Sequence, residues 1–178
     1  PAITGVSEET DFAGTFDLIR SLTPDTKHIV VIGNRTESSI EKRKALQAVV
    51  PKYSDLYSFE FYEDWTNSEL LQRVAGLPRG TVGLIIDVTS DVTGNYNYNS
   101  AAFTTELATR TRVPIFITSR PPGRHDWSVD EWDGVGGGLV VADVHGAKVG
   151  ELALRILAGE HGIVLDLGLG RVSRCQYG

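Results

Sequence analysis

Short apolar runs alternate with amphipathic stretches along most of this chain. The runs at 28–33 and 83–88 are continuous and rich in β-branched residues, which is typical of strands covered on both faces of a parallel sheet. Runs of the same kind lie at 113–118 and 139–143. Together these four runs predict the buried strands of one sheet.

One further strand has a different pattern. Tyr57, Phe59 and Phe61 alternate with the polar residues Ser58 and Glu60. A period of two with polar side chains on one face predicts a strand that is partly exposed to water. We therefore expect this strand at the edge of the sheet.

Residues at helical spacing connect the strands. They predict helices at 11–22, at 36–50, after the capping box that begins at Thr66, around Phe103 and Leu107, and at 146–158. The last helix carries one apolar stripe, which consists of Val149, Leu152, Ala153, Ile156 and Leu157.

The alternation of strands and helices predicts an α/β fold with three layers. Right-handed βαβ units build a doubly wound parallel sheet of about five strands, with helices on both faces. If the aromatic strand lies at the edge, the natural strand order is 2-1-3-4-5. Ligands of such folds lie beyond the carboxyl ends of the strands, near the switch between the first and third strands.

Composition narrows the class of protein. The chain has 178 residues, of which 41% are hydrophobic and 22% charged, as in a globular domain. The net charge of −6 argues against a nucleic-acid partner, because phosphate binding needs clustered Lys and Arg. The chain begins at Pro1 and contains no methionine. Either its N-terminus was processed, or the chain is a piece of a longer protein.

Motifs for the common kinds of catalysis are missing. The glycine cluster Gly134–Gly138 precedes a strand, so it cannot present a helix N-terminus to a phosphate. Asp87 ends a strand, as in a phosphoacceptor receiver domain, but the first strand ends in Gly33-Asn34 and not in an acidic pair. The four histidines lack the spacing of metal ligands. We expect no catalytic residue, metal or cofactor, and a protein that is not an enzyme.

The order of several segments resembles the second lobe of type I periplasmic-binding-protein folds. These segments are 3–6, 15–27, Asp91 with Gly94, 113–116, 134–138 and 146–160. Among such folds the chain is most similar to the ABC-transporter substrate-binding-like group, and in detail to the extracytoplasmic sensor regions of bacterial histidine kinases and related signalling proteins.

This resemblance implies half of a two-lobed receptor. Residues 1–160 would form the C-terminal lobe, with 1–10 as a crossover segment, and 161–178 would be a return segment and tail. The N-terminal lobe would be missing. The other expected partners are a small-molecule ligand, a downstream signalling domain and, for the isolated lobe, a second copy in a homodimer.

The function implied is that of an extracytoplasmic sensor domain within a membrane-anchored signalling protein, which signals by closure of its lobes. Two alternatives remain. The chain could come from the substrate-binding protein of an ABC transporter, or from the effector domain of a transcriptional regulator.

The residues expected to bind ligand lie in the loops at the carboxyl ends of the strands. They are Arg35, Thr36, Asp91, Tyr96, Tyr98, Arg120 and Trp127. The arginines suit a carboxylate or phosphate, the aromatic residues suit a planar ligand, and Asp91 suits an amine or hydroxyl. The alternative for the arginines is an ordinary surface ion pair, and for the tyrosines it is packing within a loop. Asp87 could equally cap the segment that comes after it.

Overall fold

The computed structural model describes residues 5–7, 10–97, 100–118, 150–155, 157–159, 163–166 and 172–174. The chain divides into two compact units. One runs from Phe12 to Leu139, and the other combines Pro1–Asp11 with Val140–Gly178.

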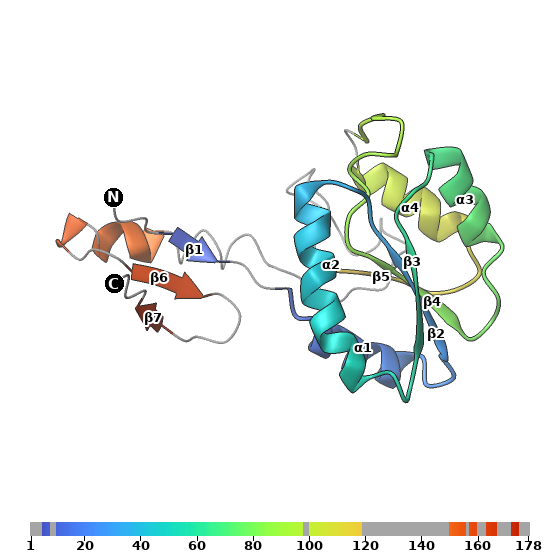
Figure 1. Ribbon diagram of the computed structural model, residues 1–178, viewed down its shortest axis with the longest axis horizontal. Helices are drawn as coiled ribbons and strands as arrows, with labels where there is room; N and C mark the ends of the chain where they lie inside the picture. Colours follow the sequence, from blue (N-terminus) through green and yellow to red (C-terminus); the bar gives the residue numbers. More distant parts are fainter. Residues whose placement is uncertain are drawn as a thin grey trace. The chain divides into compact units, whose positions relative to one another are not determined.

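A parallel sheet forms the centre of the larger unit (Figure 1). Its four strands, in the order β3-β2-β4-β5, are β2 (His28–Ile32), β3 (Ser58–Tyr62), β4 (Thr81–Ile85) and β5 (Ile115–Ile117). This order confirms the 2-1-3-4 part of the predicted topology, with the aromatic strand β3 at an edge. The predicted fifth strand, 139–143, lies outside the described residues.

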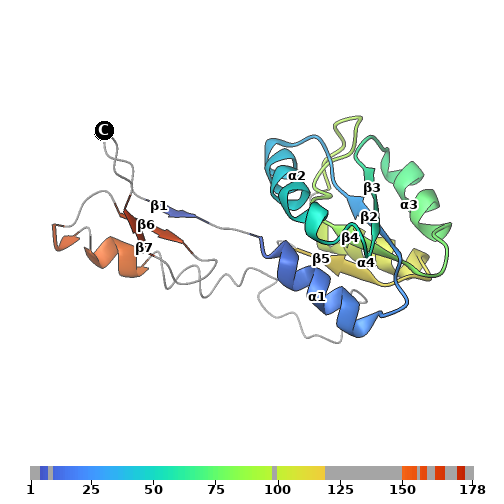
Figure 2. The same cartoon turned by 60° about the horizontal axis from the view of Figure 1, so that its bottom comes forward.

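Helices cover both faces of this sheet (Figures 1 and 2). They are α1 (Phe12–Leu22), α2 (Glu37–Val49), α3 (Asn67–Ala75) and α4 (Ser100–Arg110), with a 3-10 turn, η1 (Val50–Lys52), after α2. Ile29 and Val31 of β2 pack with residues of α1 and α2, while Val30 and Ile32 pack with residues of α3 and α4. Because successive side chains of a strand point to opposite faces, β2 contributes to two separate cores. The predicted three-layer fold is confirmed.

The strand predicted at 83–88 begins and ends earlier, as β4. The N–H groups of Ile86 and Asp87 both donate to the Ile32 carbonyl oxygen, at 2.8 and 3.4 Å. A shared acceptor marks the point where the chain leaves the regular ladder. Asp87 therefore lies beyond the end of the strand, in the loop that leads toward α4.

The smaller unit contains a three-stranded sheet. Its strands are β1 (Gly5–Ser7), β6 (Ile163–Asp166) and β7 (Val172–Arg174). β6 pairs with β1 in parallel and with β7 in antiparallel orientation. Within the segment 161–178, which we expected to be a return segment and tail, β6 and β7 are therefore strands.

The predicted apolar stripe of the last helix is only partly buried. Residues 150–155 and 157 are helical, and Leu152 is buried. Ala153 is exposed, and the side chain of Leu157 is 84% exposed. Within the described part of the chain, no helix is long and apolar enough to cross a membrane.

Candidate ligand-binding site

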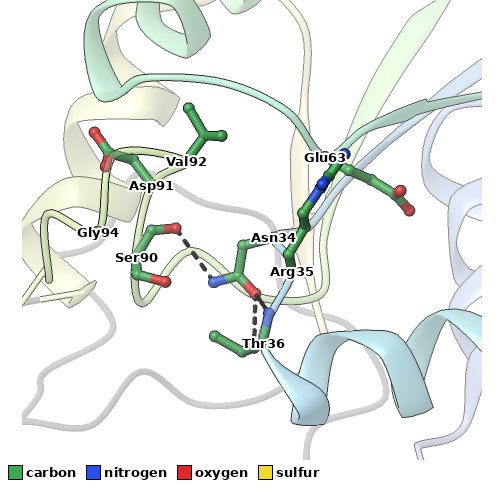
Figure 3. Close-up of a pocket in the computed structure, with 8 residues that line it drawn as sticks. All are labelled: Asn34, Arg35, Thr36, Glu63, Ser90, Asp91, Val92 and Gly94. Atoms are coloured by element: carbon green, nitrogen blue, oxygen red, sulfur yellow. Dashed lines mark hydrogen bonds between the residues drawn. The ribbon is translucent and has the colours of Figure 1, made fainter.

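A pocket of about 320 Å³ opens at the carboxyl ends of β2 and β4. Its walls come from the start of the β2–α2 loop, the end of β3 and the loop after β4 (Figure 3). The lining residues are Asn34, Arg35, Thr36, Glu63, Ser90, Asp91, Val92 and Gly94. From β2 the chain crosses to β3 on one side, and β4 lies on the other. The pocket is thus at the switch point where ligands of doubly wound sheets bind.

The side chain of Asn34 forms the floor of this pocket, and the residue is only 4% exposed. Its Nδ2 donates to Asp87 Oδ1 at 3.1 Å, and to Thr89 Oγ1 and the Ser90 carbonyl oxygen at 3.3 Å each. Its Oδ1 accepts from the N–H of Thr36 at 3.1 Å and from its hydroxyl at 2.7 Å. One amide therefore joins the end of β2, the N-cap of α2 and the loop after β4.

The carboxylate of Asp87 completes this network. Its Oδ1 accepts from the N–H of Thr89 at 2.8 Å and from its hydroxyl at 2.7 Å. Its Oδ2 accepts from the hydroxyl of Thr36 at 3.2 Å. The sequence left two roles open for Asp87, to contact ligand or to cap the segment after it. In the structure its carboxylate caps the loop that begins at Thr89.

Asp91 anchors the loop 89–97 and is 7% exposed. Its Oδ1 accepts from the N–H and hydroxyl of Thr93, at 2.9 and 2.6 Å, and from the N–H of Asn95 at 3.0 Å. Its Oδ2 accepts from the N–H of Asn67, the first residue of α3, and from the side chain of Asn95, both at 3.3 Å. A ligand amine would reach this carboxylate only at the expense of these bonds.

The hydrogen bonds also determine the protonation of Asp91. Burial by itself would raise the pKa of this carboxyl group. The hydrogen bonds from Thr93, Asn67 and Asn95 outweigh burial, and they hold the pKa below its ordinary value. The group is therefore a carboxylate at neutral pH.

Arg35 forms a two-bond ion pair with Asp64, the residue next to Glu63 of the pocket wall. Arg35 Nε lies 2.5 Å from Asp64 Oδ1, and Nη2 lies 2.6 Å from Oδ2. The hydrogen bond from Arg35 to Asp64 raises the pKa of Arg35 above its ordinary value. Both side chains are well exposed, at 71% and 57%. The surface ion pair that the sequence left as the alternative for Arg35 is thus present.

Glu63 of the pocket wall also has a basic partner. Its carboxylate forms an ion pair with Arg43 of α2, and both side chains are about one quarter exposed. Both acids at the end of β3, Glu63 and Asp64, are therefore matched by arginines.

Of the four remaining predicted residues, Tyr96 is the one that the structure describes. Tyr96 lies in the loop 89–97 but does not line the cavity, and it is 56% exposed. Tyr98, Arg120 and Trp127 lie outside the described residues. Of the seven predicted positions, Arg35, Thr36 and Asp91 line one pocket.

Asn34 and Ser90 lie at the strand ends where the sequence predicted the ligand surface, although they are not among the seven singled-out residues. Glu63 was missed. It comes directly after β3, and that position is the signal that could have selected it. Among the described residues, no group of three or more His, Cys, Asp or Glu side chains could hold a metal ion.

Comparison with solved structures shows which fold this chain is similar to. The fold is similar to the ligand-free, open structure of CD0873, a substrate-binding protein with adhesive properties from Clostridium difficile, with a TM-score of 0.60 and 22% sequence identity. The match covers 88% of this chain and 49% of CD0873, so the chain spans about half the length of that protein. No protein-family model and no curated protein matches the sequence. The comparison shows an α/β fold that resembles one lobe of a substrate-binding protein.

Proposed function

We propose that this chain is one lobe of a two-lobed, extracytoplasmic protein that binds a small molecule, as the substrate-binding proteins of ABC transporters do. The observation that carries the proposal is the pocket at the carboxyl ends of β2 and β4, on a fold similar to about half of CD0873. The pocket has polar side chains from three separate segments. Convergence of this kind is typical of ligand sites.

The proposed mechanism is closure of two lobes around the ligand. This lobe supplies a floor that is already hydrogen-bonded before ligand arrives, centred on Asn34. Preorganised contacts cost little entropy when ligand binds. The closed form would then be favoured by the contacts that ligand makes with both lobes at once.

A sensor domain of a membrane-anchored signalling protein is the second candidate. It is supported by the order of the sequence segments that resemble sensor regions of histidine kinases. Both candidates require the same binding step, but one delivers the ligand to a transporter and the other passes a signal to an output domain. The domain that the parent gene encodes after this lobe distinguishes them.

The binding step is tested by thermal unfolding of the two-lobed parent protein with amino acids, aromatic acids, sugars and purines. A ligand at a hundred times its Kd stabilises the folded state by about 2.7 kcal/mol, and the stabilisation rises with concentration. We expect one class to raise Tm in this way, and Asn34→Ala to weaken the effect. If no class raises Tm at millimolar concentration, the proposal is wrong.

A further inference from the structure

The polar side chains of the pocket differ in how far they are already satisfied. The Asp91 carboxylate accepts five hydrogen bonds from its own loop and α3, and Glu63 is paired with Arg43. A guanidinium has five N–H donors, and Asp64 engages two nitrogens of Arg35. Arg35 therefore keeps N–H donors that Asp64 does not engage. A matching ligand brings acceptor oxygens.

The pair of Arg35 and Asp64 has the geometry with which a guanidinium binds any free carboxylate. Two nitrogens face two oxygens at 2.5 and 2.6 Å. In Figure 3 the side chain of Arg35 extends toward Glu63 and away from the amide of Asn34. The cation at the pocket wall is thus turned away from the floor and is held there by an acid of the protein itself.

This pair is well placed to exchange partners. Both side chains are more than half exposed, and exposed ion pairs contribute little to stability. A free carboxylate could replace that of Asp64 without loss of a buried contact. A neutral ligand could not, because it would separate the two charges without replacing the bond.

We propose that Asp64 occupies on Arg35 the place of a ligand carboxylate, so that the pocket takes a small acidic molecule by exchanging one carboxylate for another. This inference rests on the proposed function. Asp64 is then a specificity-determining residue. It lowers the affinity for acids by competition, and it leaves neutral molecules without access to the cation.

The test is an NMR titration of the full chain with benzoate, and with benzamide as the neutral probe of the same shape. We expect Asp64→Asn to bind benzoate about three- to tenfold more tightly than the parent chain, because the internal competitor has lost its charge. Benzamide affinity should be unchanged. Asp64→Asn combined with Arg35→Gln should lose the gain.

The matched control is Asp17→Asn. Asp17 pairs with Arg20 on α1 at 3.2 Å, and both side chains are similarly exposed, at 56% and 62%. This variant changes the net charge by the same amount, away from the pocket. An equal gain for Asp17→Asn would show a general charge effect and would overturn the inference.

The outcomes separate the inference from the proposed function. If benzoate shifts the amide signals of 34–36 and 90–94 equally well in the parent chain and in Asp64→Asn, Asp64 does not compete and the inference fails. The inference also fails if only neutral compounds shift these signals, although the proposed function then stands. If neither benzoate nor benzamide shifts them in either protein, the inference fails, and the thermal-unfolding screen of the two-lobed protein decides the proposed function separately.

Discussion

At the scale of single residues, the side chain of Asn34 is held by five hydrogen bonds. It donates three, to Asp87, Thr89 and Ser90, and accepts two from Thr36. The sequence shows an asparagine after a buried strand, but its partners Asp87, Thr89 and Ser90 lie more than fifty residues away. Spacing along the chain cannot predict such a network. For the same reason, the sequence allowed an ion pair for Arg35 but did not identify Asp64 as its partner.

The first prediction concerns this network. Asn34→Ala should lower the free energy of unfolding by about 2–3 kcal/mol, because it leaves buried partners without a hydrogen bond. Urea denaturation measures the change. Ser38→Ala, at an exposed position of α2, is the control and should change stability by less than about 0.5 kcal/mol. Equal values for the two variants would show that the network contributes nothing.

The second prediction concerns the pH dependence of stability. Hydrogen bonds lower the pKa of Asp91 in the folded state, so the unfolded chain binds more protons as pH falls through the acidic range. The stability that Asp91 contributes is complete above its unfolded pKa of about 3.9 and is lost as pH falls through the lower, folded pKa. Asp91→Asn should therefore reduce the slope of stability against pH below about pH 4.

Urea denaturation at a series of pH values measures this slope. Asp55→Asn, in the exposed turn before β3, serves as the control and should keep the slope of the parent chain. If Asp91→Asn also keeps it, the hydrogen bonds to Asp91 do not favour the carboxylate.

At the scale of helices and strands, most of the larger unit could be predicted from the sequence. The capping box at Thr66 is present as expected, with Glu69 bonded back to the N–H of Thr66 at 2.8 Å. The buried strands were identified because continuous β-branched runs suit a sheet covered on both faces. The end of β4 was misplaced, since Ile86 is as apolar as the strand residues although β4 ends at Ile85.

The third prediction concerns the contact between β4 and β5. A Cβ atom added to Gly83 would lie 2.5 Å from Cδ1 of the buried Ile115. Gly83→Ala should therefore lower the free energy of unfolding by about 1–3 kcal/mol through overpacking. Ile115→Val removes the clashing methyl group, so Gly83→Ala should cost much less in that background. Strict additivity of the two variants in a double-mutant cycle would contradict this explanation.

At the scale of the whole molecule, the sequence predicted the fold class and the order of the first four strands. It did not predict that β1 pairs with β6, because this pairing joins segments at opposite ends of the chain. The extent of the lobe, its position in a longer protein and the formation of a homodimer stay predictions.

The central claim is that the pocket between the β2–α2 loop and the loop 89–97 holds a small molecule. The most direct test maps backbone amide shifts while the chain is titrated with amino acids, aromatic acids, sugars and purines. We predict shifts that cluster at 34–36 and 90–94, at the carboxyl ends of β2 and β4. Shifts confined to the amino ends of β2 and β4, around His28 and Thr81, would contradict the claim.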